Sequence, residues 1–434
     1  MSRKGASCWL DVLYLFAGLL LIPYFLFRRL IKRKQSAPWG AKLGHISPRP
    51  DAPVRIWIHA VSVGEANAAE TLVKELRRRH AQLDMVVSTT TVTGQEVARK
   101  RYGAENVIYY PVDLSRAVKR ALDRVRPTII VLMELEVWPN FTAEAAARSI
   151  PVVVVNGRIT ERSARRYKKF WSLAGPGFLR VNKWLVQSDE YAQRLRDLGV
   201  PAENIQIAGN IKYDAVDTAP PSSEERLKIR AEFGLASDAP VLIGGSTHPT
   251  EENSLLRAYA SLKKDAFPTL RLILVPRHPE RVDAVANEVT AAGFPVLRRS
   301  EMKSGKDAGD PASVILVDTV GELKSLYKAA DLAFVGGSLI PHGGQNIMEP
   351  AGLGVPVIHG PHMHNFNDAM GLLRACEGSQ EVSRETLIHK VQNLLEDRSS
   401  AAEMAARARA EFLKVQGATR ISVDFLEAFW TGKR

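Results

Sequence analysis

Short apolar runs alternate with amphipathic stretches through the first half of the chain. The runs are rich in β-branched and aromatic residues, a composition typical of buried strands. The stretches between them, such as residues 66–79 and 115–124, have the apolar spacing of helices. Strands that alternate with helices predict a mostly parallel sheet. The predicted strands are residues 54–60, 85–90, 107–110, 128–133, 152–156, 184–187 and 205–208.

The same alternation restarts after residues 216–240, which we interpret as an interdomain linker that carries a linking helix. Because 434 residues are too many for one typical core, we expect two doubly wound α/β domains. Such domains, facing one another, would bind ligands in a cleft at the carboxyl ends of their strands. The second set of predicted strands is 241–245, 272–276, 314–317, 332–335 and 355–358, and the closing helices are 384–397, 401–416 and 422–430.

The N-terminal segment has a different pattern. Residues 9–27 are mostly apolar and contain one charge, Asp11, and one proline, Pro23. A helix of that length spans roughly 28 Å, close to the hydrocarbon thickness of a bilayer. Five basic residues follow within positions 28–34, which predicts a membrane anchor with the body of the protein in the cytoplasm. A cleaved signal peptide and a helix lying in the membrane plane are the alternatives.

These patterns divide the chain into five parts. They are residues 1–35 (anchor and basic flank), 36–215 (first domain), 216–240 (linker), 241–418 (second domain) and 419–434 (C-terminal helix). Charge follows the same division, because residues 1–215 hold 34 Lys and Arg against 19 Asp and Glu, whereas the remainder holds 25 against 28. A one-sided basic excess predicts an anionic partner for one half and argues against a nucleic-acid coat protein. The two cysteines, Cys8 and Cys376, indicate no disulfide framework.

Candidate chemistry in the first half lies just after predicted strands. Glu65 falls in the first turn of a helix after residues 54–60, where the helix dipole favours a carboxylate that can accept a proton. Glu134 follows residues 128–133 and could bind a substrate hydroxyl or brace a basic side chain. Lys212 could supply a point charge to a leaving phosphate or a sugar carboxylate. The alternatives are a helix-start glutamate that only complements the dipole and a solvated loop lysine.

Candidate chemistry in the second half indicates a phosphate-bearing ligand. Residues 334–349 combine an apolar strand, two glycine pairs and a helix start near Asn346, so the main chain could approach an anion closely. Arg277 offers a fork suited to phosphate, and Glu322 could bond a ribose. The histidines at 359, 362 and 364 are irregularly spaced and the sequence has no Asp-x-Asp pair, so we expect no metal site.

Taken together, these motifs resemble the 3-deoxy-D-manno-octulosonic acid (Kdo) transferases. The resemblance covers most of the chain, from the anchor to about Met370, and is carried by residues 59–65, 88–94, 133–140, 209–214, 246–248, 275–281, 318–322, 334–349 and 360–368. It implies a GT-B fold with two Rossmann-like domains, the first binding the acceptor and the second the donor, CMP-Kdo. It also implies an inverting, metal-independent transfer to a lipid A precursor (lipid IVA) in lipopolysaccharide core biosynthesis.

The resemblance also implies roles for individual residues. Glu65 matches the general base, and Glu134 and Lys212 match positions that stabilise the transition state. The positions that match the CMP-binding residues are Pro276, Arg277, Val320, Gly321, Glu322, Asn346, Ile347, Met348 and Glu349. No cofactor or metal is expected, and the location would be the cytoplasmic face of the inner membrane, where Arg158 and basic residues between 162 and 169 would meet anionic head groups.

This sequence departs from the family pattern at three places. Gln345 stands where the family more often has histidine, Leu135 replaces a small polar residue, and residues 39–44 match the family's basic stretch only loosely. Two other functions stay open at this point. One is a GT-B enzyme that uses another nucleotide sugar, including an epimerase. The other is a non-catalytic basic binder of membranes or nucleic acid, although aromatic stacking surfaces interleaved with Lys and Arg are not evident.

Overall fold

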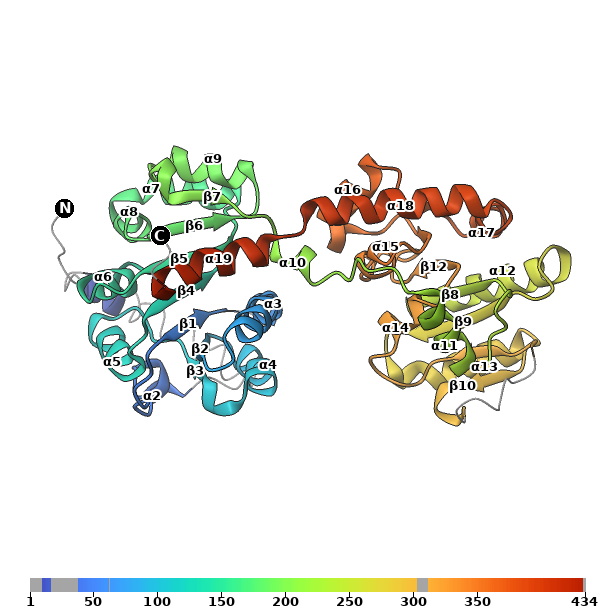
Figure 1. Ribbon diagram of the computed structural model, residues 1–434, viewed down its shortest axis with the longest axis horizontal. Helices are drawn as coiled ribbons and strands as arrows, with labels where there is room; N and C mark the ends of the chain where they lie inside the picture. Colours follow the sequence, from blue (N-terminus) through green and yellow to red (C-terminus); the bar gives the residue numbers. More distant parts are fainter. Residues whose placement is uncertain (1–9, 17–37, 62, 303–310, 432–434) are drawn as a thin grey trace. The chain divides into compact units, whose positions relative to one another are not determined.

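The computed structural model describes residues 10–16, 38–61, 63–302 and 311–431 (Figure 1). It divides into two compact units. The first unit is Met1–Ala215 together with Val415–Arg434, and the second unit is Val216–Lys414. Each unit is built around one parallel sheet.

The sheet of the first unit has seven strands in the order β3-β2-β1-β4-β5-β6-β7. The strands are β1 (Arg55–His59), β2 (Asp84–Thr89), β3 (Val107–Tyr109), β4 (Ile129–Met133), β5 (Val152–Gly157), β6 (Lys183–Val186) and β7 (Ile205–Ile207). All seven predicted strands of this half are therefore confirmed. The direction of strand order reverses between β1 and β4, and ligands of doubly wound sheets bind at such a switch point.

Helices cover both faces of this sheet. Ile58 on β1 packs in one core with Leu72 of α3, and Trp57, the next residue along the same strand, packs in the other core with Phe141 of α6. Burial on both faces explains why these strands read as continuous apolar runs. The helices are α2 (Trp39–Lys42), α3 (Val63–Arg79), α4 (Val92–Tyr102), α5 (Ser115–Val125), α6 (Pro139–Ala147), α7 (Glu161–Lys169), α8 (Trp171–Leu179), α9 (Asp189–Asp197), α10 (Ile211–Asp214) and α19 (Ala418–Thr431).

The sheet of the second unit also has seven strands, in the order β10-β11-β9-β8-β12-β13-β14, and its switch point lies between β8 and β12. The strands are β8 (Val241–Thr247), β9 (Arg271–Pro276), β10 (Val296–Arg298), β11 (Val314–Leu316), β12 (Leu332–Val335), β13 (Val357–His359) and β14 (Gln380–Glu381). The helices are α11 (Ser223–Glu232), α12 (Glu251–Asp265), α13 (Val282–Ala291), α14 (Leu323–Tyr327), α15 (Met348–Gly352), α16 (Asn367–Ala375), α17 (Leu387–Glu396) and α18 (Arg398–Val415).

The segment expected to be a linker, residues 216–240, belongs to the second unit. It contains α11, whose Ile229 and the following Phe233 join a buried core with β8. Arg230 is 2 % exposed, and its Nη2 donates to Asp331 Oδ2 at 2.6 Å. A buried guanidinium with a carboxylate partner ties the segment to the domain body, so it is part of the domain and not a free joint.

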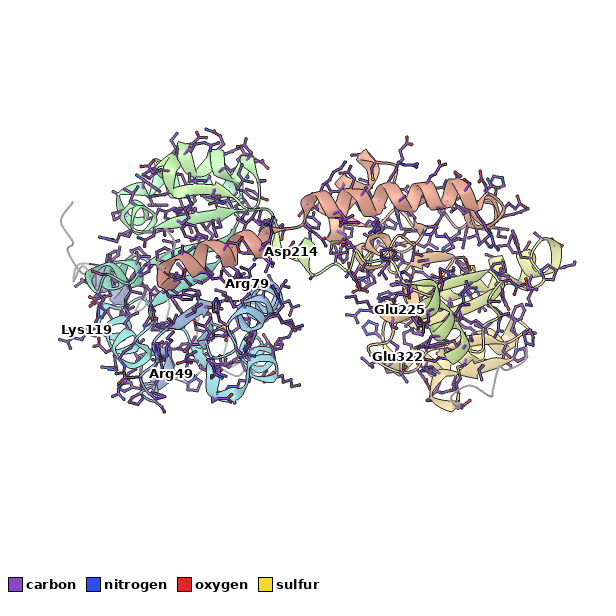
Figure 2. All side chains as sticks on the ribbon, in the orientation of Figure 1. Arg49, Arg79, Lys119, Asp214, Glu225 and Glu322 are labelled. Atoms are coloured by element: carbon purple, nitrogen blue, oxygen red, sulfur yellow. The ribbon has the colours of Figure 1, made fainter. Side chains whose placement is uncertain are left out.

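The last helix, α19, returns to the first unit. Val423 and Leu426 are buried in the same core as Ile58. Asp214, labelled in Figure 2, fixes the segment where the chain returns to the first unit. Its carboxylate accepts hydrogen bonds from the backbone N–H groups of Gly417, at 2.6 Å, and Thr419. The C-terminal helix is thus an integral part of the N-terminal domain.

The beginning of the described chain is a short helix over residues 10–16. Asp11, the one charge of the predicted anchor, accepts a bond from the Ser115 N–H at 2.9 Å and one from Asn140 Nδ2 at 3.0 Å. Tyr14 Oη donates to Asp113 at 3.1 Å. Residues 17–27 of the predicted anchor lie outside the described residues. Among the residues that the structure does describe, no helix is long and apolar enough to cross a membrane.

Two glycines of the second unit should respond oppositely to alanine. A Cβ at Gly336 would lie 2.3 Å from the Ser246 carbonyl oxygen, whereas a Cβ at Gly371, inside α16, would meet nothing within 4 Å. We expect Gly336→Ala to lower the free energy of unfolding by about 3 kcal/mol and Gly371→Ala to raise it by about 0.5–1 kcal/mol. Chemical denaturation of both variants measures this, and equal effects would contradict it.

Candidate active site

Glu65 lies in the first turn of α3, directly beyond the carboxyl end of β1. It is half-buried, and its Oε2 accepts a hydrogen bond from the backbone N–H of Val61 at 2.9 Å. The bond fixes the carboxylate over the first turn, where exposed N–H groups and the helix dipole favour negative charge. Glu65 therefore stands at the switch point of the first sheet, on the side where ligands of this fold bind.

Two more carboxylates reach the same edge from the end of β4. Glu134 adopts a left-handed conformation with φ 58°, which is unusual for a residue with a side chain. Burial raises the pKa of Glu134, the charge of Glu65 raises it further, and Arg158 opposes both. Burial also raises the pKa of Glu136, which accepts a bond from Trp138 Nε1 at 3.0 Å. The edge is thus acidic and holds groups suited to proton exchange.

Lys212 belongs to the short helix α10, which packs against α3. Asn210 caps α10, because its Oδ1 accepts the Lys212 N–H at 3.0 Å. Asn156, at the end of β5, accepts the Ile211 N–H at 3.1 Å. Two asparagines therefore bring an exposed lysine to the edge that carries Glu65. The structure gathers the three predicted catalytic residues, while their roles stay a prediction.

In the second unit, the predicted donor residues come from three loops. Pro276 ends β9 and Arg277 follows it, exposed, with its N–H bonded to the Thr247 carbonyl at 3.0 Å. Val320 is 83 % exposed and Gly321 has φ 96°, so this turn presents backbone to solvent. Glu322 is held by Arg299, whose Nε donates to its carboxylate at 2.9 Å.

The third predicted segment, residues 346–349, leads into α15. Asn346 lies two residues before it, accepts the Met348 N–H at 3.2 Å, and donates from Nδ2 to Glu349 at 2.9 Å. Burial raises the pKa of Glu349. The helix packs against α14, the helix that follows Glu322. Ile347 and Met348 are 0 % and 3 % exposed, so their side chains belong to the core and a ligand would meet this segment through Asn346 and Glu349.

The glycine loop after β12 was expected to offer free backbone N–H groups to a phosphate, and the structure differs from this expectation. The carboxylate of Glu251, 0 % exposed at the start of α12, accepts N–H bonds from Gly337 at 2.7 Å and from Ser338 and Leu339 at 2.9 Å each. It also accepts the His248 N–H at 2.9 Å. These amides are already used within the protein, so they cannot hold a phosphate, and the expectation was wrong for this part of the loop.

The histidines considered for a metal do not form a metal centre. His359 is 2 % exposed, and its Nδ1 lies 2.7 Å from the Gly360 carbonyl oxygen. In the part of the chain that the structure describes, no group of three or more His, Cys, Asp or Glu is arranged to hold an ion. Metal independence itself stays a prediction.

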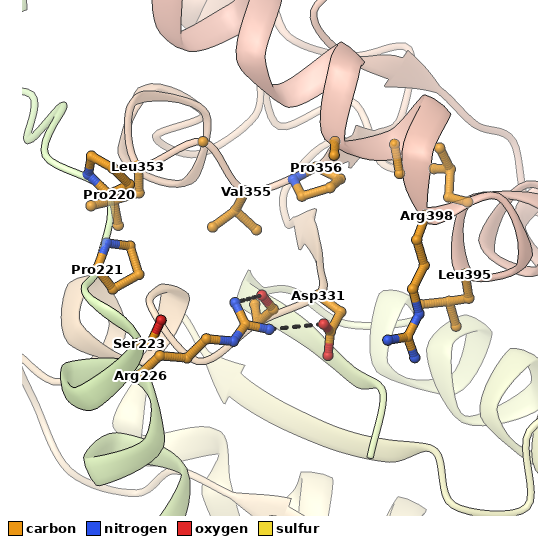
Figure 3. A pocket seen from close by; sticks show the side chains of 15 residues that line it. Pro220, Pro221, Ser223, Arg226, Asp331, Leu353, Val355, Pro356, Leu395 and Arg398 are labelled. Carbon is orange, nitrogen blue, oxygen red and sulfur yellow. Dashed lines mark hydrogen bonds and ion pairs between the residues drawn. The ribbon is translucent and has the colours of Figure 1, made fainter. Parts of the chain in front are cut away.

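A hollow of about 330 Å³ lies at the opposite end of the second sheet (Figure 3). Asp331, just before β12, and Pro356, just before β13, line it, and Arg226 donates to Asp331 across one wall at 2.8 Å. The hollow is therefore at the amino ends of the strands and contains none of the predicted site residues. The fold places ligands at the other end.

Comparisons with known proteins agree with this geometry. Residues 37–215 match the family described as 3-Deoxy-D-manno-octulosonic-acid transferase (kdotransferase). The 3-deoxy-D-manno-octulosonic acid transferase of Haemophilus influenzae is 35 % identical over 87 % of this chain and 87 % of its own. The enzyme of the same name from Bordetella pertussis is 33 % identical over 95 % of this chain and 96 % of its own.

Among solved structures, UDP-GlcNAc 2-epimerase from Neisseria meningitidis has a TM-score of 0.53 at 12 % identity, covering 86 % of this chain and 99 % of its own. That likeness concerns the fold alone. Two parallel α/β units, each with a switch point in its sheet, define a GT-B-like fold. The sequence relatives are more specific: the chain belongs to the 3-deoxy-D-manno-octulosonic acid transferase family and is a glycosyltransferase of lipopolysaccharide biosynthesis.

Proposed function

We propose that this enzyme transfers Kdo from CMP-Kdo to lipid IVA, with inversion at the anomeric carbon and without a metal ion. The observation that carries the proposal is the position of Glu65, a fixed and half-buried carboxylate at the switch point of the first sheet. The predicted donor residues gather at the corresponding edge of the second sheet. Base and donor site thus belong to different units, an arrangement suited to a two-substrate transfer.

In the proposed reaction Glu65 accepts the proton of an acceptor hydroxyl. At the same time, the oxygen of that hydroxyl forms a bond to the anomeric carbon of Kdo. The bond from that carbon to the phosphate oxygen breaks, and CMP leaves with the electron pair. Attack from the face opposite the leaving group inverts the configuration. Arg277 suits the phosphate of CMP, and Lys212 supplies positive charge near the reacting groups. These side chains can stabilise a single leaving phosphate without a metal cation.

The proposed acceptor is a lipid, so the enzyme should work at the cytoplasmic face of the inner membrane. Helix α7 supports a lipid-facing role, because it has no buried residue and carries basic side chains through its length. Phe170, which follows it, is 52 % exposed. Basic and aromatic side chains together favour an anionic membrane surface. We therefore propose membrane phospholipid, and not nucleic acid, as the macromolecular partner of the basic half.

One incubation tests the function. The full chain is mixed with lipid IVA and either CMP-Kdo or a UDP-sugar, and both nucleotide release and the mass of the lipid product are followed. We expect nucleotide release and a lipid heavier by one or more Kdo residues with CMP-Kdo alone; the mass also counts the residues added. Turnover of a UDP-sugar without use of CMP-Kdo would overturn the proposal.

A further inference from the structure

Three imidazoles converge at the carboxyl ends of β8, β9 and β12 in the second unit. His248 follows β8, His278 follows β9, and His342 lies in the loop after β12. The ring centroid of His248 lies 4.1 Å from that of His342 and 5.6 Å from that of His278, both edge to face. His248 is 4 % exposed, while the other two are exposed. The cluster is a buried imidazole beneath two that reach solvent.

The surroundings of this histidine cluster are positive. The pKa of His248 is lowered to about 4, mainly by burial, with smaller contributions from His342, His278, Arg281 and Arg277 in that order. His248 is therefore neutral at physiological pH, and the groups around it add positive charge and N–H donors. Such an environment at the switch point of an α/β sheet suits an anionic ligand.

The nearby carboxylates do not neutralise the cluster. The carboxylate of Glu251 accepts hydrogen bonds from four backbone N–H groups. Glu252 is 0 % exposed and pairs with Arg281 Nη1 at 2.7 Å, so it offsets the charge of Arg281 and leaves that of Arg277. Glu280 is 74 % exposed and its oxygen lies 3.6 Å from His278 Nδ1, a solvent-screened contact of little strength. Within the described residues, Arg277 and His342 form no ion pair at 4.0 Å or less.

Gln345 completes the arrangement. Its Nε2 lies 3.0 Å from His248 Nε2, so the neutral imidazole accepts one amide hydrogen and the second is directed elsewhere. The Gln345 N–H is bonded to the Gly336 carbonyl at 3.0 Å, which fixes the residue in the loop. Because Glu251 takes the amides of the loop's first residues, 337–339, side chains are the donors left for an anion there, and His342 and Gln345 provide N–H groups.

We propose that His342 and Gln345, supported from beneath by His248, bind the carboxylate of the donor sugar. The inference rests on the proposed function, in which the donor carries a phosphodiester and a carboxylate. Arg277 offers the fork for the phosphate, and the nucleoside residues Glu322 and Glu349 lie by α14 and α15. The cluster beside α12 is then left for the second anion of the donor.

This assignment makes the cluster a specificity determinant. A nucleotide-activated neutral hexose has no carboxylate, so it would leave the positive pocket and its donors unpaired. A site built for a polar group rejects analogues that lack it because its buried groups then lose their partner. The enzyme should therefore distinguish an acidic sugar from a neutral one through residues that touch neither the base nor the phosphate.

The test compares two ligands on the full chain without acceptor: CMP, which has the phosphate alone, and CMP-Kdo, which has both anions. Loss of one hydrogen bond to a charged group weakens binding about 10- to 100-fold. We expect His342→Ala and Gln345→Ala each to weaken CMP-Kdo binding by that factor and to leave the Kd of CMP within about threefold. His342→Arg, which supplies N–H donors in place of those of the imidazole, should bind CMP-Kdo nearly as the wild type does.

His389→Ala is the matched control, because it removes an exposed imidazole from α17 and should change neither constant. Retained CMP binding shows that each variant is folded. Parallel weakening of CMP and CMP-Kdo binding would mean that the cluster holds the phosphate, and unchanged CMP-Kdo binding would mean that it holds neither anion. Either result would overturn the carboxylate site but not the proposed function. A wild type that binds no CMP-Kdo would overturn the proposed function as well.

Discussion

Glu65→Gln should reduce Kdo transfer by at least about 10²-fold, the scale of losing a general base. The amide keeps the size of the carboxylate and can still accept the Val61 N–H that now bonds Glu65 at 2.9 Å, so the helix start is preserved. It cannot take a proton from the acceptor hydroxyl at neutral pH. Initial rates of CMP release at saturating lipid IVA measure the loss.

Donor affinity should survive the same change, because the predicted donor residues belong to the other unit. Glu96→Gln is the matched control, an exposed glutamate on neighbouring α4, and should keep full activity. If Glu65→Gln turned over at the wild-type rate, the base would have to be another group. Glu134 and Glu136, whose pKa values burial raises, would then be the candidates.

Glu251→Ala should destabilise the second unit by at least about 4 kcal/mol, because each buried donor left without an acceptor costs about 1–3 kcal/mol. Four backbone N–H groups from His248 and the loop after β12 lose their partner at once. We expect a lower denaturation midpoint, faster amide hydrogen exchange in residues 336–345, and weaker donor binding, since the loop carries Gln345 and leads into Asn346.

Glu280→Ala provides the comparison for that experiment. Glu280 lies in the same region, but its side chain is 74 % exposed, so its removal should change the free energy of unfolding by no more than about 0.5 kcal/mol. Normal exchange rates in the loop of Glu251→Ala would show that the glycine turns hold their conformation without the carboxylate.

The buried strands could be predicted closely from the sequence, because burial on both faces produces unbroken apolar runs. Residues 152–156 were expected and β5 is Val152–Gly157. The edge strands β10 and β14 could not be predicted in this way, since they are three and two residues long and none of their residues is fully buried. Pairing with a neighbour makes them strands, and pairing is a tertiary property that no local pattern records.

Some residues of the candidate site could likewise be predicted from the sequence, and others could not. Glu65 and Arg277 could be identified because parallel strands bring their carboxyl ends to one edge, so position after a strand predicts proximity. The role of Glu251 could not be identified, because it depends on a bond to Gly337, 86 residues further along the chain. Its signal in the sequence is faint: a glutamate three residues after His248, at the start of a helix.

The contribution of α19 to the first unit has a consequence for synthesis of the protein on the ribosome. The second unit is continuous, Val216–Lys414, but the first needs Val415–Arg434 to be complete. The domain translated first therefore cannot complete its fold until the end of the chain has been translated. Until then, the apolar surface that Val423 and Leu426 cover is exposed to solvent. A nascent chain released early would lack that cover, so truncation at the 3′ end of the message would damage the domain encoded at the 5′ end.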